Sequence, residues 1–217
     1  MVNRYKEKAL LNPEEKAARL LEIPLFQVLA KEEREALASK LQSRRMLKGQ
    51  QIFLQGDPGD EMFLLLEGRI KICCESLNGR EITLTFLDDG GFFGEMALLD
   101  GEPRSATAVA ESNGQLLVLR RADFQSYLRE VPQASVALLA YLSRLLRRAN
   151  DKIQDLALLT VRERLAAVLS DLAEKEGEAD SAGRILLPKS VSHKAISGLL
   201  GTSRETVSRM CSDLKEH

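Results

Sequence analysis

The stretch FGEMALLDGEPRSAT, residues 93–107, combines groups suited to binding a ligand. Gly94 and Glu95 precede a short apolar turn, and Arg104 and Ser105 follow it. A guanidinium forms strong charge-assisted hydrogen bonds with anions, a carboxylate accepts from hydroxyl groups, and glycine allows a close backbone approach. These residues are therefore candidates for a binding site. The alternative is a salt bridge between Glu95 and Arg104 in a pocket that binds nothing.

The last residues, VSHKAISGLLGTSRETVSRMCSDLKEH, have the spacing of a helix-turn-helix. Ser192 can cap a first helix, whose apolar residues share one face: Ile196, Leu199 and Leu200. Gly201 supplies the turn, and Thr202 and Glu205 are expected to form a capping box that opens the second helix.

Polar side chains on the second helix suit the reading of DNA bases. Arg204 and Ser208 share one row and Glu205 and Arg209 the next, near the helix end that enters a major groove. Arginine donates two hydrogen bonds to guanine, and glutamate accepts one from cytosine. Residues 184–217 also carry six Lys or Arg against three Asp or Glu. The alternative is a surface helical hairpin in which Glu205 pairs with Arg209.

The elements that hold the first stretch are predicted to be β-strands. Between Met46 and Leu119, glycines separate short β-type runs such as QIFLQ, MFLLLEG, RIKICCE and EITLTFL, a pattern typical of an antiparallel β-barrel or jelly roll. The residues NGR at 78–80 indicate a hairpin turn. Before the barrel, two helices are expected to cover it, with a break at Pro24 and the second helix over residues 31–41.

A long helix is predicted after the barrel, with its only proline at its start. A two-position heptad seam runs along it through Leu139, Leu142, Leu146, Ala149, Ile153 and Leu156. So narrow a seam favours a contact between two copies of the helix, and hence a homodimer. A further helix, VRERLAAVLSDLAEKE, leads into GEADSAG, which is expected to be a surface loop. The predicted domains are 1–130, 131–160 and 161–217.

The composition limits the classes of function. The chain has 217 residues, is 44% hydrophobic and 29% charged, and has a net charge of -1. Its apolar runs are too short to span a membrane, and its N-terminus lacks a signal-peptide core, so we expect a cytoplasmic protein without a membrane partner. Three cysteines and two histidines, with no C-x-x-C pair, argue against a metal site and against an enzyme with a nucleophile and a base.

Together these motifs resemble the Crp/Fnr family of bacterial transcription regulators. GTSRETVSR is similar to the family's recognition helix. The family's cyclic-nucleotide-binding barrel is matched, in order, by LKGQQIFLQGDPGDEMFLLLEGRIKI, NGREITLTFL, GFFGEMALLDGEPRSATA and LLVLRRADF. The resemblance extends from about Leu21 to the C-terminus. It implies an α+β fold with an N-terminal β jelly roll, a long dimerisation helix and a C-terminal helix-turn-helix domain of the winged-helix type.

The resemblance also implies an effector and the residues that bind it. The effector would be a cyclic nucleotide, cyclic AMP or cyclic GMP, with no metal. Arg104 and Ser105 would bind its phosphate together with backbone N–H groups near Glu95, and Glu95 would accept from the ribose hydroxyl. Gly94 would let the chain approach the sugar. The full set is Gly94, Glu95, Met96, Ala97, Arg104, Ser105, Ala149 and Asn150.

The implied partners are a second copy, RNA polymerase and a palindromic DNA operator with TGTGA-like half-sites. The predicted DNA-binding residues are Ser192, Lys194, Ser203, Arg204, Glu205, Thr206, Ser208 and Arg209. Regulation by abundance, without any ligand, is the alternative.

Two departures from the family pattern concern the base and the DNA. Relatives that respond to cyclic AMP carry Thr or Ser where this chain has Ala149, although the amide of the following Asn150, on the helix of the second copy, can donate and accept at a base edge. Relatives also continue past the recognition helix into a β-hairpin wing, whereas this sequence ends at His217. Iron–sulfur and haem sensing are not expected, because no cysteine precedes Cys73 and the barrel contains no histidine.

Overall fold

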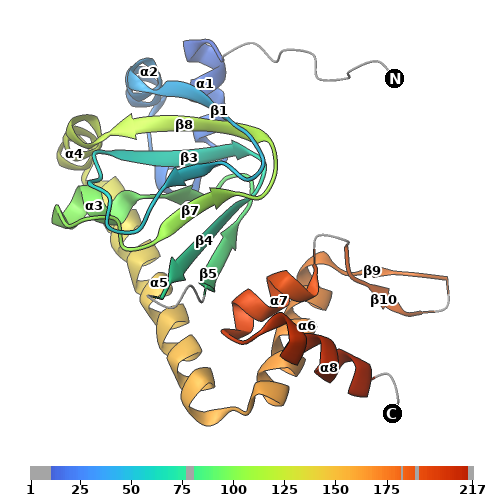
Figure 1. Cartoon of the computed structure of the whole chain (residues 1–217). Coiled ribbons are helices and arrows are strands. Elements are labelled where there is room, and N and C mark those ends of the chain that lie inside the picture. The colour runs from blue at the N-terminus through green and yellow to red at the C-terminus, as the bar shows by residue number, and fades with distance from the viewer. Residues whose placement is uncertain (1–10, 77–80, 182, 189–190, 215–217) are drawn as a thin grey trace. The chain divides into compact units, whose positions relative to one another are not determined.

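The computed structural model describes residues 11–76, 81–181, 183–188 and 191–214. The expected NGR turn lies outside these residues. The chain divides into two compact units, the first formed by Met1–Ile72 and Phe86–Leu142 and the second by Cys73–Thr85 and Ser143–His217 (Figure 1).

Short helices open the first unit, as predicted. They are α1 (Pro13–Leu20), the 3-10 turn η1 (Pro24–Phe26) and α2 (Lys31–Lys40). The Asn12 side chain caps α1 by accepting from the backbone N–H of Glu15 at 2.9 Å. The predicted break at Pro24 is confirmed, because this proline begins η1.

Two antiparallel four-stranded sheets follow, so the predicted β-rich fold is confirmed (Figure 1). One has the order β1 (Gln42–Met46), β8 (Gly114–Arg120), β3 (Glu61–Glu67) and β6 (Phe92–Phe93). The other has the order β2 (Gln51–Phe53), β7 (Thr107–Ala110), β4 (Ile70–Glu75) and β5 (Glu81–Leu87).

Strand β3 is buried on both of its faces, and its alternation separates two cores. Phe63 and Leu65 belong to a cluster that includes Phe93, Ala108 and Ala110 from β6 and β7. The intervening residues of β3 pack instead with the helical residues of a second cluster: Met62, Leu64 and Leu66 against Leu20, Phe26, Leu37, Phe124 and Leu138. This two-sided burial explains why β3 is a continuous apolar run, and why the flanking helices cover the barrel.

The remaining helices of this region are α3 (Glu95–Asp100), α4 (Arg121–Glu130) and α5 (Pro132–Leu158). Pro132 is the first residue of α5, where its missing N–H leaves no helical hydrogen bond unmade. The predicted seam lies mainly on the exposed side of α5, with 63% exposure for both Leu139 and Leu146 and 64% for Ile153. Leu142 differs, because it is partly buried against the first unit's helical core.

The second unit carries the C-terminal elements. They are α6 (Val161–Glu176), β9 (Glu178–Ala179), β10 (Ile185–Leu186), α7 (His193–Leu200) and α8 (Arg204–Asp213). The prediction of a plain surface loop for GEADSAG was wrong in part, because Glu178 and Ala179 pair with Leu186 and Ile185 in a short ribbon. The buried core of the unit consists of Leu165, Leu172, Ile196, Leu200 and Val207.

Within this unit, α7 packs closely on strand β5. An ideal Cβ built on Gly198 would lie 2.5 Å from the Oγ1 atom of Thr83, which is 1% exposed. The ammonium group of Lys152, on α5, donates to the Thr83 carbonyl oxygen at 2.9 Å. Thr83 thus contacts two helices of the unit, and the approach of α7 depends on the absence of a side chain at Gly198.

We expect Gly198→Ala to destabilise the protein by about 1–3 kcal/mol, because the added methyl group overpacks the contact with Thr83. Thermal unfolding measures the change. Thr83→Ala provides the matched partner, since it removes Oγ1 and leaves the Thr83 Cβ at 3.5 Å from the new methyl group. In the double variant the penalty of Gly198→Ala should disappear. Additive effects of the two substitutions would contradict the contact.

Candidate functional site

Six of the predicted ligand residues come together in the first unit, around α3. Gly94 caps α3 with φ +83°, Glu95 and Ala97 are buried, and Met96 is exposed. Arg104 and the exposed Ser105 follow on the segment leading to β7, and the Ser105 hydroxyl lies 3.6 Å from the Met96 sulfur. The other two, Ala149 and Asn150, are exposed on the part of α5 that belongs to the second unit.

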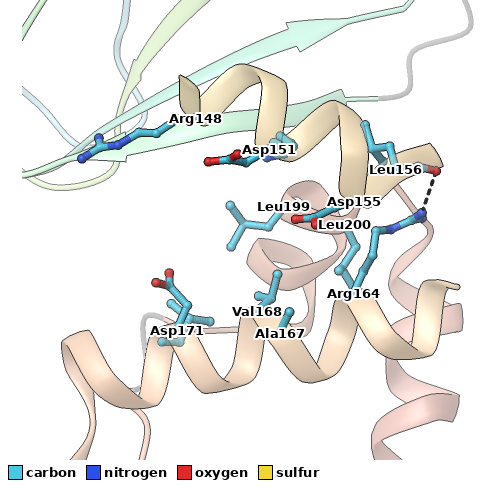
Figure 2. A pocket seen from close by; sticks show the side chains of 12 residues that line it. Arg148, Asp151, Asp155, Leu156, Arg164, Ala167, Val168, Asp171, Leu199 and Leu200 are labelled. Atoms are coloured by element: carbon cyan, nitrogen blue, oxygen red, sulfur yellow. Dashed lines mark hydrogen bonds between the residues drawn. The ribbon is translucent and has the colours of Figure 1, made fainter. Parts of the chain in front are cut away.

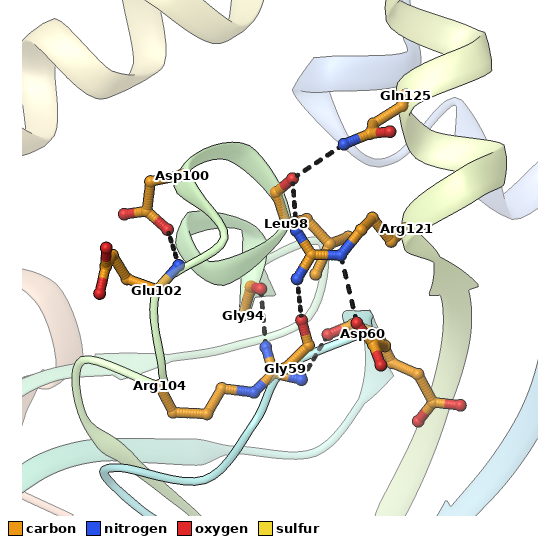
Figure 3. Close-up of polar contacts among 10 residues, drawn as sticks. Gly59, Asp60, Gly94, Leu98, Asp100, Glu102, Arg104, Arg121 and Gln125 are labelled. Atoms are coloured by element: carbon orange, nitrogen blue, oxygen red, sulfur yellow. Dashed lines mark hydrogen bonds and ion pairs between the residues drawn. The ribbon is translucent and has the colours of Figure 1, made fainter.

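The guanidinium of Arg104 is held by backbone carbonyls from two segments (Figure 3). Nη1 donates to the Gly94 oxygen at 2.8 Å, and Nη2 donates to the Glu61 oxygen at 2.6 Å. Its Cζ lies 4.2 Å from the centroid of the Phe53 ring, within cation–π range. We call Gly59, Glu61, Phe53 and Gly94 the Arg104 cradle.

One donor of Arg104 has no protein partner. The side chain is buried, with 6% exposure of the residue, and its Nε–H makes no hydrogen bond to any residue that the structure describes. Burial lowers the pKa of Arg104, and the carboxylates of Glu61 and Asp60 oppose this shift. A buried guanidinium N–H without a partner is costly, so this atom is available to an acceptor that a ligand would bring. The phosphate of a cyclic nucleotide fits this requirement.

Glu95 is the buried carboxylate of the site. It is 4% exposed, and burial raises its pKa, while hydrogen bonding to its own backbone N–H and the charge of Arg104 act in the opposite direction. Among the described residues no ion pair joins Glu95 to Arg104, whose bound donors go to carbonyl oxygens. The alternative of a simple Glu95–Arg104 salt bridge therefore does not describe this site.

The structure adds cradle residues that the sequence interpretation did not include. An ideal Cβ on Gly59 would lie 2.8 Å from Arg104 Cζ and 2.7 Å from Ala97 Cβ. A Cβ on Gly94 would lie 2.7 Å from Arg104 Nη1, so this glycine admits the guanidinium. Its expected role was to admit the sugar. In the sequence, Gly59 was visible only as one of the glycines that separate the β-type runs.

The second unit contains a cavity of about 350 Å³ lined by residues of α5, α6 and α7 (Figure 2). Apolar side chains such as Leu172 and Leu200 lie beside charged ones such as Asp155 and Arg164. Arg164 donates to the Leu159 oxygen at 3.2 Å and so satisfies a carbonyl just after α5 ends. Neither Ala149 nor Asn150 lines this cavity.

Helices α7 and α8 have the predicted helix-turn-helix arrangement. The Ser192 hydroxyl accepts from the Ala195 N–H at 3.2 Å, which confirms this cap. Gly201 ends α7 with φ +64°, the left-handed conformation expected at the turn. The predicted Thr202–Glu205 capping box was wrong, because α8 is capped one residue later. Ser203 Oγ accepts from the Thr206 N–H at 3.1 Å.

The side chains predicted to read bases are available on α8. Arg204, Glu205 and Arg209 are exposed, whereas Val207 is fully buried and anchors the helix. No ion pair links Glu205 to Arg209 in the part of the chain that the structure describes, so both remain able to bind other groups. A hydrogen bond to its own backbone N–H, with a further one to Ser203, holds the pKa of Glu205 below its usual range. Glu205 is therefore an acceptor at neutral pH.

The remaining predicted DNA contacts lie at the start of α7 and along the first half of α8. Ser192, Lys194 and Ser203 are exposed, and Thr206 and Ser208 are half-buried.

No described helix is long and apolar enough to cross a membrane. Within the described ranges, no group of three His, Cys, Asp or Glu side chains is arranged to hold a metal ion.

Comparisons with known proteins match both parts of the chain that carry these candidate sites. Residues 43–131 match the cyclic nucleotide-binding domain, and residues 163–217 match the Crp-like helix-turn-helix domain. The chain is 38% identical to the cyclic AMP receptor protein of Thermus thermophilus over 89% of its length and 86% of the relative's. It is 32% identical to the global nitrogen regulator of Synechococcus elongatus, covering 81% of this chain and 80% of that one.

A solved structure shares the fold. The c-di-GMP responsive global regulator CLP of Xanthomonas campestris aligns with a TM-score of 0.77 at 24% identity, covering 86% of this chain and 92% of that chain. Proteins with this pair of domains are transcription regulators and not enzymes. The chain belongs to the Crp/Fnr family and is a DNA-binding transcription regulator with a cyclic-nucleotide-binding domain.

Proposed function

We propose that this regulator is a homodimer controlled by cyclic AMP and directed to TGTGA-like inverted repeats. The observation that carries the proposal is the buried Nε–H of Arg104, which has no partner among the described residues. It belongs to a guanidinium whose other two nitrogens are already aligned by backbone carbonyls. An equatorial phosphate oxygen can accept a hydrogen bond from this donor, and the Ser105 hydroxyl can donate a second hydrogen bond to the phosphate. The Glu95 carboxylate then accepts from the ribose 2′-hydroxyl.

The name of the relative that is 38% identical, a cyclic AMP receptor protein, favours cyclic AMP as the effector. Ala149 offers no hydrogen bond to adenine, so we assign recognition of the base to Asn150 of the second copy, whose amide both donates and accepts. This amide can turn to meet the edge of either base, so we expect less discrimination against cyclic GMP than in relatives with Thr or Ser at position 149. Regulation by abundance alone is the second candidate, and the relatives also include a protein called a global nitrogen regulator.

Calorimetry separates these candidates. The full chain is titrated with cyclic AMP and then with cyclic GMP. Binding of cyclic AMP, with one site per chain at the Arg104 cradle, supports effector control. Absence of heat for both nucleotides, together with operator binding that needs no ligand, would favour the second candidate.

The proposed dimer uses the exposed apolar seam of α5. Leu139, Leu146 and Ile153 are each more than half exposed, which would be costly along a helix that remained in water. A parallel pairing of two such helices buries this seam and gives the assembly a twofold axis. We also assign residues 1–130 to effector binding, 131–160 to dimerisation and 161–217 to DNA and RNA polymerase, with the protein acting in the cytoplasm.

The proposed operator follows from α8. Arg204 and Arg209 each bind a guanine through two hydrogen bonds, and Glu205 accepts from the cytosine paired with one of these two guanines. These contacts define a TGTGA half-site. The twofold axis then requires the inverted repeat TGTGA–N6–TCACA, with half-site centres about one helical turn apart. Ser192, Lys194, Ser203, Thr206 and Ser208 surround the reading residues and contact phosphates.

We expect Glu205→Ala to relax the preference at one base pair by about 1–3 kcal/mol per half-site, because the acceptor for cytosine is lost. Competition binding with all four base pairs at that position measures the change. Lys194→Ala is the matched control, since loss of a phosphate contact should weaken all sequences alike. If Glu205→Ala kept the full preference, the assignment of this residue to cytosine would be wrong.

A further inference from the structure

We propose that Arg121, the first residue of α4, is a positioning residue that holds the two walls of the Arg104 cradle at a fixed separation. The inference rests on the proposed nucleotide site and extends it to a residue that does not touch the nucleotide. It is carried by a set of hydrogen bonds in the first unit, drawn in Figure 3.

The cradle has two walls that come from different parts of the chain. One is the segment Gly59–Glu61, which supplies a carbonyl to Arg104 and leaves space for its guanidinium. The other is the start of α3, where Gly94 supplies the second carbonyl. Arg104 itself bonds to both walls. The direction in which its Nε–H points toward the proposed phosphate depends on the distance between these walls.

Arg121 binds the first wall directly and reaches the second through the C-terminal end of α3. Its Nη2 donates to the Gly59 oxygen at 2.6 Å, and its Nη1 donates to the Leu98 oxygen in α3 at 3.2 Å. Its Nε pairs with the Asp60 carboxylate at 3.2 Å, and its backbone N–H donates to the Asp60 oxygen at 2.8 Å. A single planar guanidinium therefore sets the distance between the Gly59 wall and α3.

The bond to Leu98 has a further physical reason. Leu98 lies in the last turn of α3, where carbonyl groups lack helical partners and the negative end of the helix dipole favours a cation. The Glu102 N–H is engaged by the Asp100 side chain at 3.0 Å. The Leu98 oxygen is instead reached by Arg121 and, at 3.4 Å, by the Gln125 amide of α4. Helix α3 is thus fixed to α4 at its C-terminal end.

Charge alone does not account for this arrangement. The positive charge of Arg121 opposes that of Arg104 and helps to lower the Arg104 pKa, whereas Asp60 raises it. A role limited to electrostatic attraction of the phosphate would be served equally by lysine at position 121. A positioning role would not, because an ammonium group cannot span the Gly59, Asp60 and Leu98 oxygens with fixed geometry.

The test compares Arg121→Lys with Arg44→Lys in the full chain, using calorimetry with cyclic AMP. Arg44 is the matched control, because its Nη2 pairs with the Glu61 carboxylate at 2.9 Å without contacting a cradle carbonyl. We expect Arg121→Lys to weaken binding about tenfold or more, the factor typical of a lost charged hydrogen bond. Arg44→Lys should bind as the wild type does. Equal affinities for Arg121→Lys and the wild type would overturn the inference.

Asp60→Asn provides a second variant, which still tests the inference if the Arg121→Lys protein folds poorly. The substitution should not disturb the fold, because the Asp60 side chain is 83% exposed. It removes a negative charge near the phosphate site, so electrostatics alone would strengthen nucleotide binding. Loss of the partner that orients Arg121 should instead weaken it, by up to about fivefold. Tighter binding would contradict the positioning role.

A ligand-free measurement keeps this inference separate from the proposed function. The Nε–H group of Arg104 gives its own signal in a ¹H–¹⁵N spectrum, and its position depends on the cradle. We expect Arg121→Lys to shift or broaden this signal in the free protein, and Arg44→Lys to leave it in place. A wild type that bound no nucleotide would refute the proposed effector. An Arg104 signal unmoved by Arg121→Lys would refute the positioning role.

Discussion

Replacement of Arg104 by leucine should remove cyclic-nucleotide binding, with a loss of affinity of at least about 30-fold. The expected cost is about 2–5 kcal/mol, because the phosphate would enter a buried site with no cation to meet its charge. Leucine also leaves the Gly94 and Glu61 carbonyl oxygens without donors. The affinity for cyclic AMP is measured by calorimetry on the full chain.

The same substitution could act by unfolding the barrel, and two further variants separate this effect from a loss of recognition. Arg104→Lys keeps a cation and should retain part of the affinity, since it loses mainly the paired geometry. Arg44→Leu removes another arginine that pairs with Glu61 and lies over the Phe63 ring, and it should bind nucleotide normally. If Arg104→Leu were folded by thermal unfolding and bound cyclic AMP like the wild type, Arg104 would have no place in the site.

The sequence was sufficient to identify Arg104 but not its cradle. Composition and spacing in residues 93–107 mark a cation and a carboxylate that belong together. The cradle depends on long-range closure, since the Arg104 guanidinium contacts the Glu61 carbonyl 43 residues away. A backbone oxygen has no signature in a sequence, because every residue carries one. Gly59 was visible as a glycine, yet its close approach to Arg104 follows only from the pairing of strands.

The sequence predicted the bounds of helices and strands more successfully where these bounds depend only on neighbouring residues. The bounds of β5, α6 and the start of α5 follow from alternation, helix periodicity and a proline at a helix start. The error at α8 has the same origin, because Thr202 and Ser203 are both good caps, and the choice depends on how the turn after Gly201 closes. The inclusion of Leu142 in a uniform seam was made from periodicity alone. The structure partly buries this side chain in its own unit, which depends on the packing of α5 against the barrel.

That difference within the seam decides which position best tests the dimer. Leu146 is 63% exposed, so a substitution there does not disturb the core to which Leu142 contributes. We expect Leu146→Glu to convert the protein to monomers in sedimentation equilibrium, because two carboxylates would be buried against each other at the twofold axis. Arg144→Glu is the control. It places the same side chain two residues away, about 200° around the helix, and should leave the dimer intact.

Loss of the dimer should also change DNA binding in a way that separates it from damage to α8. A monomer still presents Arg204, Glu205 and Arg209, so its affinity for a single TGTGA half-site should equal that of the wild type. Its affinity for the full inverted repeat should fall by about 100-fold or more, because the second half-site no longer gains from the tethering of the first. A Leu146→Glu protein that sediments as a dimer would show that the seam is not the interface. A monomer that kept full affinity for the repeat would show that the two recognition helices do not act through the twofold axis of α5.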